Sequence, residues 1–131
     1  MKIKGCRTER ELLHKFYDEG WQACRVAGSG STPLPAPDLI AGKDGRILVI
    51  ECKAGKGDKK YIETEQIDEL NKLATKMGAE AWIGLRFDRE DWYFIQPKNL
   101  NKTKGGNIVI SLDFIKQKGR TLKGLIKCRQ N

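Results

Sequence analysis

Two carboxylates and a lysine are grouped between Pro37 and Lys53, where Asp38 opens one apolar run and Glu51-Cys52-Lys53 closes the next. Hydrolysis of a phosphodiester needs a divalent ion that neutralises developing charge and lowers the pKa of the attacking water, and Mg²⁺ prefers carboxylate oxygens. Asp38 and Glu51 offer such oxygens, and the Cys52 carbonyl offers another ligand. The Lys53 ammonium can orient the water or stabilise the transition state. The pattern of Asp, spacer, Glu, any residue and Lys therefore indicates a metal-dependent nuclease.

A β-hairpin is expected to bring these side chains together. Each run is long enough for a strand, and Asp44-Gly45 between them supplies the positive φ angles that a type I′ turn needs. The register then pairs Lys43 with Arg46, Ala41 with Leu48, Leu39 with Ile50 and Asp38 with Glu51. Opposed residues have Cβ atoms about 5 Å apart, and Lys53 points to the same face as Glu51. Both faces are otherwise mostly apolar, so a charged cluster there needs a compensating ligand, and a divalent cation is suited to that role.

Two helices are expected to add polar groups to this hairpin. Thr8 and Glu11 have the spacing of a capping box, which predicts a helix from this point, or from one turn earlier, to Gly20. Glu9 falls on or beside the apolar stripe of that helix, so it is either a third metal ligand or a first-turn Glu that complements the helix dipole. A second helix spans residues 63–77. Gln66 lies on its apolar stripe, either as a flanking residue or as a support for the hairpin cluster.

Two polar loops flank the hairpin. Residues 28–32 read Gly-Ser-Gly-Ser-Thr, which can form a small anion-binding concavity or a plain linker. Residues 54–60 are rich in glycine and charge, and are expected to form a loop outside the core. Their lysines, at positions 56, 59 and 60, are either contacts for a phosphate backbone or solvated surface.

The remaining segments predict an α/β fold of one domain over residues 1–131. Residues 21–27 and 108–110 read as short strands, residues 81–87 and 92–95 as a second hairpin, and residues 112–126 as helical turns broken at Gly119. The aromatic side chains of the second hairpin, Phe87, Trp92 and Phe94, are expected in the core, with a dimer interface as the other interpretation.

The net charge indicates the type of binding partner, and the cysteine content indicates the cellular compartment. Lys and Arg number 25 against 17 Asp and Glu, a net charge of +8, which favours a polyanionic partner, although such charge also serves solubility. The four cysteines form no CxxC pair and read as free thiols of an intracellular, cytoplasmic protein in a reducing environment. No segment reads as a signal peptide or a membrane span, so we expect a soluble protein.

The sequence resembles the archaeal-type Holliday junction resolvases of the PD-(D/E)xK nuclease superfamily. The resemblance rests on Arg7-Thr8-Glu9-Arg10-Glu11-Leu12, Arg25-Val26-Ala27-Gly28-Ser29-Gly30-Ser31, Pro37-Asp38-Leu39-Ile40-Ala41 and Ile50-Glu51-Cys52-Lys53. It implies a restriction-endonuclease-like core, with a central mixed β-sheet flanked by helices. It also implies a homodimeric Mg²⁺-dependent endonuclease, in which Mn²⁺ can substitute. Such an enzyme cuts four-way DNA junctions by paired incisions in strands of like polarity during recombination and repair.

The same resemblance implies roles for individual residues. Glu9, Asp38 and Glu51 would hold the metal, and Lys53 would assist the nucleophile or the transition state. Ser29 would be required for catalysis near the scissile phosphate. The residues expected to contact DNA are Arg7, Arg10, Arg25, Ser31, Lys56, Lys59 and Lys60, with Gln66 supporting the site. No small-molecule cofactor is expected.

Two other functions remain open on the residues alone. A restriction-like or repair nuclease would use the same chemistry on another branched, damaged or duplex DNA. A non-catalytic basic DNA-binding module would carry Asp38, Glu51 and Lys53 as an inert salt-bridge cluster. Retention of these three charges together with Glu9 argues against that module, because apolar residues fill a purely structural role at lower energetic cost.

Overall fold

The structure is a computed structural model that describes residues 3–27, 34–101 and 106–127. Its strands are β1 (Gln22–Arg25), β2 (Leu39–Lys43), β3 (Arg46–Gly55), β4 (Lys59–Glu63), β5 (Glu80–Phe87), β6 (Trp92–Ile95), β7 (Asn107–Ser111) and β8 (Arg120–Thr121). Its helices are α1 (Ile3–Asp18), α2 (Thr64–Met77), the 3-10 helix η1 (Pro97–Asn99), α3 (Leu112–Lys118) and α4 (Leu122–Lys127).

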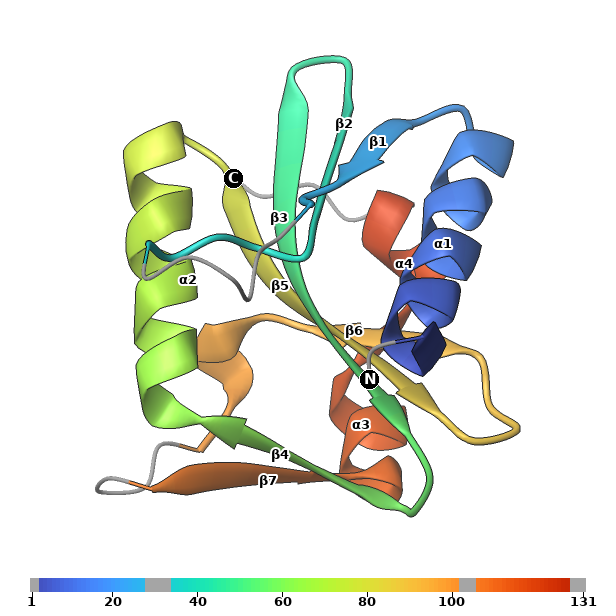
Figure 1. The fold of residues 1–131 in the computed structure, drawn as a ribbon, viewed down its shortest axis with the longest axis vertical. Helices are drawn as coiled ribbons and strands as arrows, with labels where there is room; N and C mark the ends of the chain where they lie inside the picture. The colour runs from blue at the N-terminus through green and yellow to red at the C-terminus, as the bar shows by residue number, and fades with distance from the viewer. Residues whose placement is uncertain (1–2, 28–33, 102–105, 128–131) are drawn as a thin grey trace.

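Six strands form a central mixed sheet in the order β1-β2-β3-β5-β6-β8 (Figure 1). The pairing of β3 with β5 is parallel and the other pairings in this sheet are antiparallel. Strands β4 and β7 form a separate antiparallel ribbon. The predicted α/β fold with a mixed sheet and flanking helices is confirmed.

The predicted hairpin is formed by β2 and β3. Asp44 and Gly45 have φ angles of 52° and 82°, as the type I′ turn requires. The register pairs Lys43 with Arg46, Ala41 with Leu48 and Leu39 with Ile50, as expected. Since β2 and β5 flank β3 on its two sides, the strand that carries Glu51 and Lys53 is central in the sheet.

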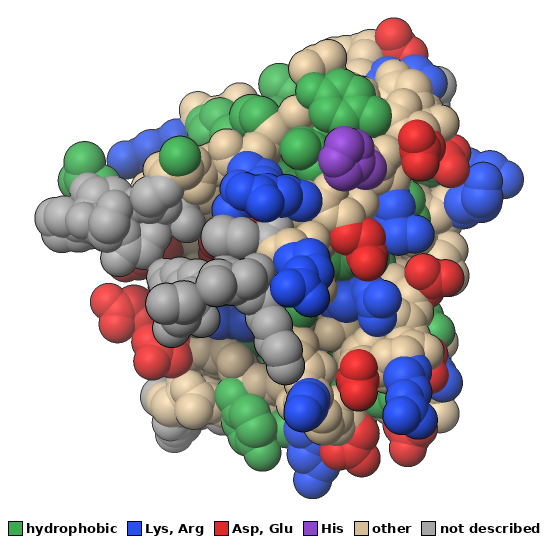
Figure 2. All heavy atoms as spheres, turned by 45° about the vertical axis from the view of Figure 1, so that its right-hand side comes forward, with side chains coloured by type: hydrophobic (Ala, Val, Ile, Leu, Met, Phe, Trp, Pro, Cys, Tyr) green, Lys and Arg blue, Asp and Glu red, His purple; other side chains and the backbone are tan. Residues whose placement is uncertain are grey.

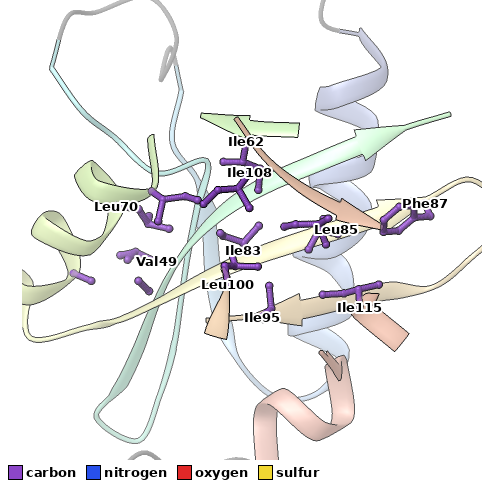
Figure 3. Close-up of a cluster of buried hydrophobic side chains, with 14 residues drawn as sticks. Val49, Ile62, Leu70, Ile83, Leu85, Phe87, Ile95, Leu100, Ile108 and Ile115 are labelled. Atoms are coloured by element: carbon purple, nitrogen blue, oxygen red, sulfur yellow. The ribbon is translucent and has the colours of Figure 1, made fainter. Parts of the chain in front are cut away.

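The two faces of β3 pack in different layers. Leu48 and Ile50 join Leu12 and Phe16 of α1 in one cluster of buried side chains. Val49 belongs to a second cluster, which lies between α2, the sheet and the β4–β7 ribbon (Figure 3). Because side chains alternate along a strand, Glu51 and Lys53 share the face of Val49, toward α2.

Helix α1 begins at Ile3, so the capping-box start at Thr8 was wrong and the earlier start is confirmed. Glu11 therefore lies inside the helix, and its Oε1 accepts hydrogen bonds from Arg86 Nε at 3.0 Å and Trp92 Nε1 at 2.9 Å. The side chain that would close a capping box instead ties α1 to the β5–β6 hairpin. Among the described residues, no helix is long and apolar enough to cross a membrane.

The second half of the chain follows the prediction except at the ribbon, at η1 and at β8, a short strand that pairs with β6 where only helical turns were expected. Phe87, Trp92 and Phe94 are 1%, 2% and 0% exposed, so these aromatic side chains belong to the core. Residues 54–60 were expected to form a loop outside the core, but β3 continues to Gly55 and β4 begins at Lys59. Strand β4 exists because β7 pairs with it, and that pairing joins residues far apart in sequence. The predicted strand at 108–110 is therefore β7 of the ribbon.

Candidate active site

Asp38 and Glu51 lie side by side at the end of the hairpin opposite its turn. The backbone N–H of Asp38 donates to the Ile50 carbonyl at 3.0 Å, which continues the register one residue beyond β2. The carboxylate of Asp38 then accepts a hydrogen bond from the Cys52 N–H, with 2.9 Å between Cys52 N and Asp38 Oδ2. These two bonds fix the Asp38 side chain against β3, next to Glu51.

The Glu51 carboxyl has an unusual acidity. Burial raises its pKa to about 8, and the negative charge of Asp38 and a hydrogen bond with that side chain act in the same direction. Lys53 opposes this shift, and Glu9 adds to it. Without a metal ion, the Asp38–Glu51 pair therefore holds a proton at neutral pH. Two adjacent carboxylates of this kind are hard oxygen ligands, so the donor set fits Mg²⁺, which would replace the proton.

Lys53 is oriented by the second helix. Its Nζ lies 3.4 Å from the Oε1 of Gln66, which is in the first turn of α2. Gln66 therefore faces the hairpin cluster, as one of the two sequence interpretations predicted. The contact joins β3 and α2 at the point where Glu51 and Lys53 share a face.

Glu9 approaches from the α1 side of the sheet and is bound to Arg25. Arg25 Nε lies 3.2 Å from Glu9 Oε1, and both side chains are mostly buried. The charge of Glu9 raises the pKa of both Glu51 and Cys52. In the part of the chain that the structure describes, no three His, Cys, Asp or Glu side chains form a metal-binding group. Of the three predicted metal ligands, the structure thus brings together Asp38 and Glu51.

The Cys52 thiol takes no part in this cluster. It is half-buried against the α1 side, where burial raises its pKa, with a further rise from the charges of Asp38 and Glu9. Its backbone is what matters at the site, because the Cys52 N–H holds Asp38. Sequence reasoning missed this anchor, since every residue except proline offers an N–H and no side-chain type signals it.

The predicted DNA contacts differ in exposure. Arg7 and Arg10 of α1 are exposed, as are Lys56 and Lys59, while Arg25 is mostly buried against Glu9. Figure 2 shows Lys and Arg side chains interspersed with Asp and Glu side chains on the side of the molecule where α1 lies. Ser29 and Ser31 lie outside the described residues.

Lys60 does not fit its predicted contact with DNA. It is 6% exposed, and its Nζ donates to the backbone carbonyls of Gly55, Lys56 and Gly57 at 2.9, 3.2 and 3.4 Å. The alternation of β4 turns Lys60 and Ile62 inward while Lys59 and Tyr61 face outward. A lysine ammonium has three protons to donate, and here each of them has a carbonyl acceptor within 3.5 Å.

A family model for archaeal Holliday junction resolvases (Hjc) matches residues 1–131. The crossover junction endodeoxyribonuclease Hjc of Archaeoglobus fulgidus is 39% identical over 104 residues, covering 79% of this chain and 76% of that protein. The Hjc of Sulfolobus acidocaldarius is 38% identical over 117 residues, covering 88% and 81% of the two chains. A solved structure of Archaeoglobus fulgidus Hjc, a Holliday junction resolvase, superposes with a TM-score of 0.83 at 32% identity, covering 92% of this chain and 98% of the other.

Proposed function

Because the chain belongs to the archaeal Holliday junction resolvase family, we propose that it is a structure-selective endonuclease that resolves four-way DNA junctions. One observation supports this function at the level of individual residues. Asp38 shares a hydrogen bond with Glu51, which lies near Lys53 on the central strand β3. A strand buried on both faces retains such charges at a high cost in desolvation. Catalysis on a phosphodiester accounts for that cost, whereas packing does not.

Asp38 and Glu51 would hold Mg²⁺, with Mn²⁺ as a substitute. The ion, when bound, would neutralise charge on the phosphate and lower the pKa of the attacking water. The protein contributes a fixed pair of oxygen ligands, because the Cys52 N–H holds the Asp38 carboxylate against β3. Burial of Glu51 keeps this pair in a region of low dielectric, where its attraction for a cation is strong.

Lys53 would place its ammonium beside the reacting phosphate. A fixed positive charge stabilises the negative charge that develops on the phosphate oxygens in the transition state, provided the charge is already in position. The Gln66 amide oxygen supplies that position through its hydrogen bond with Lys53 Nζ. Gln66 would therefore act through Lys53 and make no contact with the DNA.

Residues around this centre would hold the DNA. The Arg25 guanidinium would bind a backbone phosphate while Glu9 fixes its orientation. Glu9 would reach the metal only if DNA binding releases it from Arg25. We keep Ser29 as a catalytic residue near the scissile phosphate. The remaining proposed DNA contacts are Arg7, Arg10, Ser31, Lys56 and Lys59.

Resolution of a junction needs two cuts in strands of like polarity, and hence two active sites related by a twofold axis. We therefore propose a homodimer as the active form. Because Phe87, Trp92 and Phe94 are buried in the protomer, its interface would use other residues. A reducing intracellular compartment with access to chromosomal DNA is the expected setting, and the free thiols of Cys24 and Cys52 are compatible with it.

The function is tested by offering the protein a four-way junction, a replication-type fork and plain duplex of matched sequence. Each substrate is labelled on one strand at a time and incubated with Mg²⁺ or with a chelator. We expect paired nicks at symmetric positions in the junction, only with the metal, and much slower cutting of fork and duplex. Equal rates on duplex and junction would remove the resolvase function and leave a general nuclease.

A further inference from the structure

Lys60 is the only buried charged residue among the described residues, and nothing in the proposed chemistry uses it. Its ammonium is enclosed by the carbonyls of Gly55, Lys56 and Gly57, and it lies 4.5 Å from the centre of the Phe87 ring. The ring face attracts the positive charge, as the three carbonyl dipoles do. Burying a lysine is costly unless its charge is compensated, and here the compensating carbonyls belong to the backbone that surrounds the ammonium. The arrangement therefore fixes the position of that backbone.

The enclosed ammonium shapes the turn that follows the catalytic strand. Gly55 and Gly57 both have positive φ, at 136° and 89°, so the backbone folds its carbonyls inward toward Lys60. From the other side, the Leu112 N–H donates to the Asp58 carbonyl at 2.8 Å. A loop rich in glycine would otherwise sample many conformations. Here residues 55–58, which we term the clamp loop, are held in one.

The clamp loop continues directly from the proposed active site. Lys56 follows Lys53 by three residues, so the two Cα atoms are at most about 10 Å apart along an extended strand. One strand of B-DNA carries a phosphate about every 3.4 Å of helix axis, so such a span covers a few successive phosphates, and Lys56 is exposed. With the loop fixed, the backbone at Lys56 is held at a set distance from Lys53, and its exposed side chain is free to meet a phosphate there.

We propose that Lys60 is a positioning residue for DNA binding: its ammonium closes the clamp loop and so holds Lys56 against a phosphate next to the scissile one. This inference rests on the proposed function, in that the phosphate belongs to the nuclease substrate. The sequence predicted that Lys60 contacts DNA. In this proposal Lys60 instead acts through the loop backbone and makes no contact with DNA. Burial lowers the pKa of Lys60, while the charges of Asp88 and Asp58 raise it.

The test is a double-mutant cycle between Lys60→Met and Lys56→Ala, with Lys98→Met as the matched control. Methionine is unbranched and one atom shorter than lysine, so it can still pack against Phe87, but it carries no charge and donates to no carbonyl. Lys98 lies exposed on η1, outside the proposed interface, so its substitution removes one charge without touching the clamp loop. Affinity for a four-way junction is measured by fluorescence anisotropy over a range of salt concentrations, with a chelator present to prevent cutting. Single-turnover cleavage is then measured with Mg²⁺ at saturating protein.

We expect Lys60→Met and Lys56→Ala each to raise the Kd by up to about tenfold and to reduce the salt slope by about one. The double variant should bind no more weakly than Lys60→Met, because both changes remove the same contact. Lys98→Met, which lies outside the proposed interface, should bind and cleave the junction like the wild type. Lys60→Arg, which keeps the charge and the donors, should restore most of the affinity.

Several results would overturn the inference. One is that the losses of binding free energy in the two single variants add up in the double variant. Another is a Kd for Lys60→Met no higher than that of Lys98→Met. The third is a wild-type Kd for Lys56→Ala. If Lys60→Met does not fold, the same comparison is made with Lys60→Gln, whose shorter, neutral amide has two N–H donors in place of the three of the ammonium. None of these outcomes affects the resolvase function, because that function depends on which substrate the wild-type protein cuts.

Discussion

The acidity of Glu51 predicts an unusual dependence of stability on pH in the metal-free protein. Burial and the neighbouring Asp38 raise the pKa of Glu51 from 4.5 to about 8 in the folded state. Between these values the folded protein binds more protons than the unfolded chain, so the free energy of unfolding falls as pH rises. One pKa unit corresponds to about 1.4 kcal/mol, which makes this loss roughly 4 kcal/mol between pH 5 and pH 9.

Replacement of Glu51 by Gln removes the titrating group while keeping the side chain's size and one hydrogen bond to Asp38. Urea unfolding of the wild type and Glu51→Gln is followed by tryptophan fluorescence at pH 5, 7 and 9, with a chelator present. The wild type should lose stability across this range, and Glu51→Gln should lose much less, with the urea dependence of the unfolding free energy unchanged. Mg²⁺ should stabilise the wild type more at pH 9 than at pH 5, because it need not displace a proton there. Equal pH dependence in the two proteins would refute a neutral Glu51.

Three further changes test other parts of the account. Gln66→Ala should lower the single-turnover cleavage rate by about tenfold to a hundredfold with junction affinity unchanged, because Lys53 loses its support; a wild-type rate would contradict the positioning role. Arg25→Ala should weaken junction binding and reduce the salt slope by about one, and a wild-type slope would place Arg25 outside the interface. Arg46→Met should lower the free energy of unfolding by about 3 kcal/mol, because it leaves the mostly buried Glu80 without its two-bond partner. Cleavage by the folded Arg46→Met protein should be normal, and an unchanged unfolding midpoint would show that this pair contributes nothing.

The hairpin could be predicted from sequence because its determinants are local. Asp44-Gly45 sets the turn, the turn sets the register, and the alternation of side chains then places Asp38, Glu51 and Lys53 together. Gln66 had two interpretations, and its hydrogen bond with Lys53 decides between them. These predictions needed no knowledge of how distant segments pack.

The features that sequence reasoning missed depend on distant contacts. Strand β4 pairs with β7, more than forty residues away, so its residues looked like a charged loop. Lys60 was assigned to the surface because lysine is mostly exposed, whereas its carbonyl acceptors exist only once the clamp loop has folded. Glu11 was assigned to a capping box because the spacing was correct, but Arg86 and Trp92 bind its carboxylate. In each case a tertiary partner outweighed the local signal.

The central claim is that Asp38, Glu51 and Lys53 form the catalytic centre of a junction-cutting nuclease. Its most direct test is Lys53→Ala, with cleavage of a four-way junction and binding to it measured in the same preparation, and Lys98→Ala as the control. We predict that Lys53→Ala loses cleavage by several orders of magnitude while its Kd for the junction stays near the wild-type value. Cleavage by Lys53→Ala at a rate comparable to that of Lys98→Ala would contradict the claim.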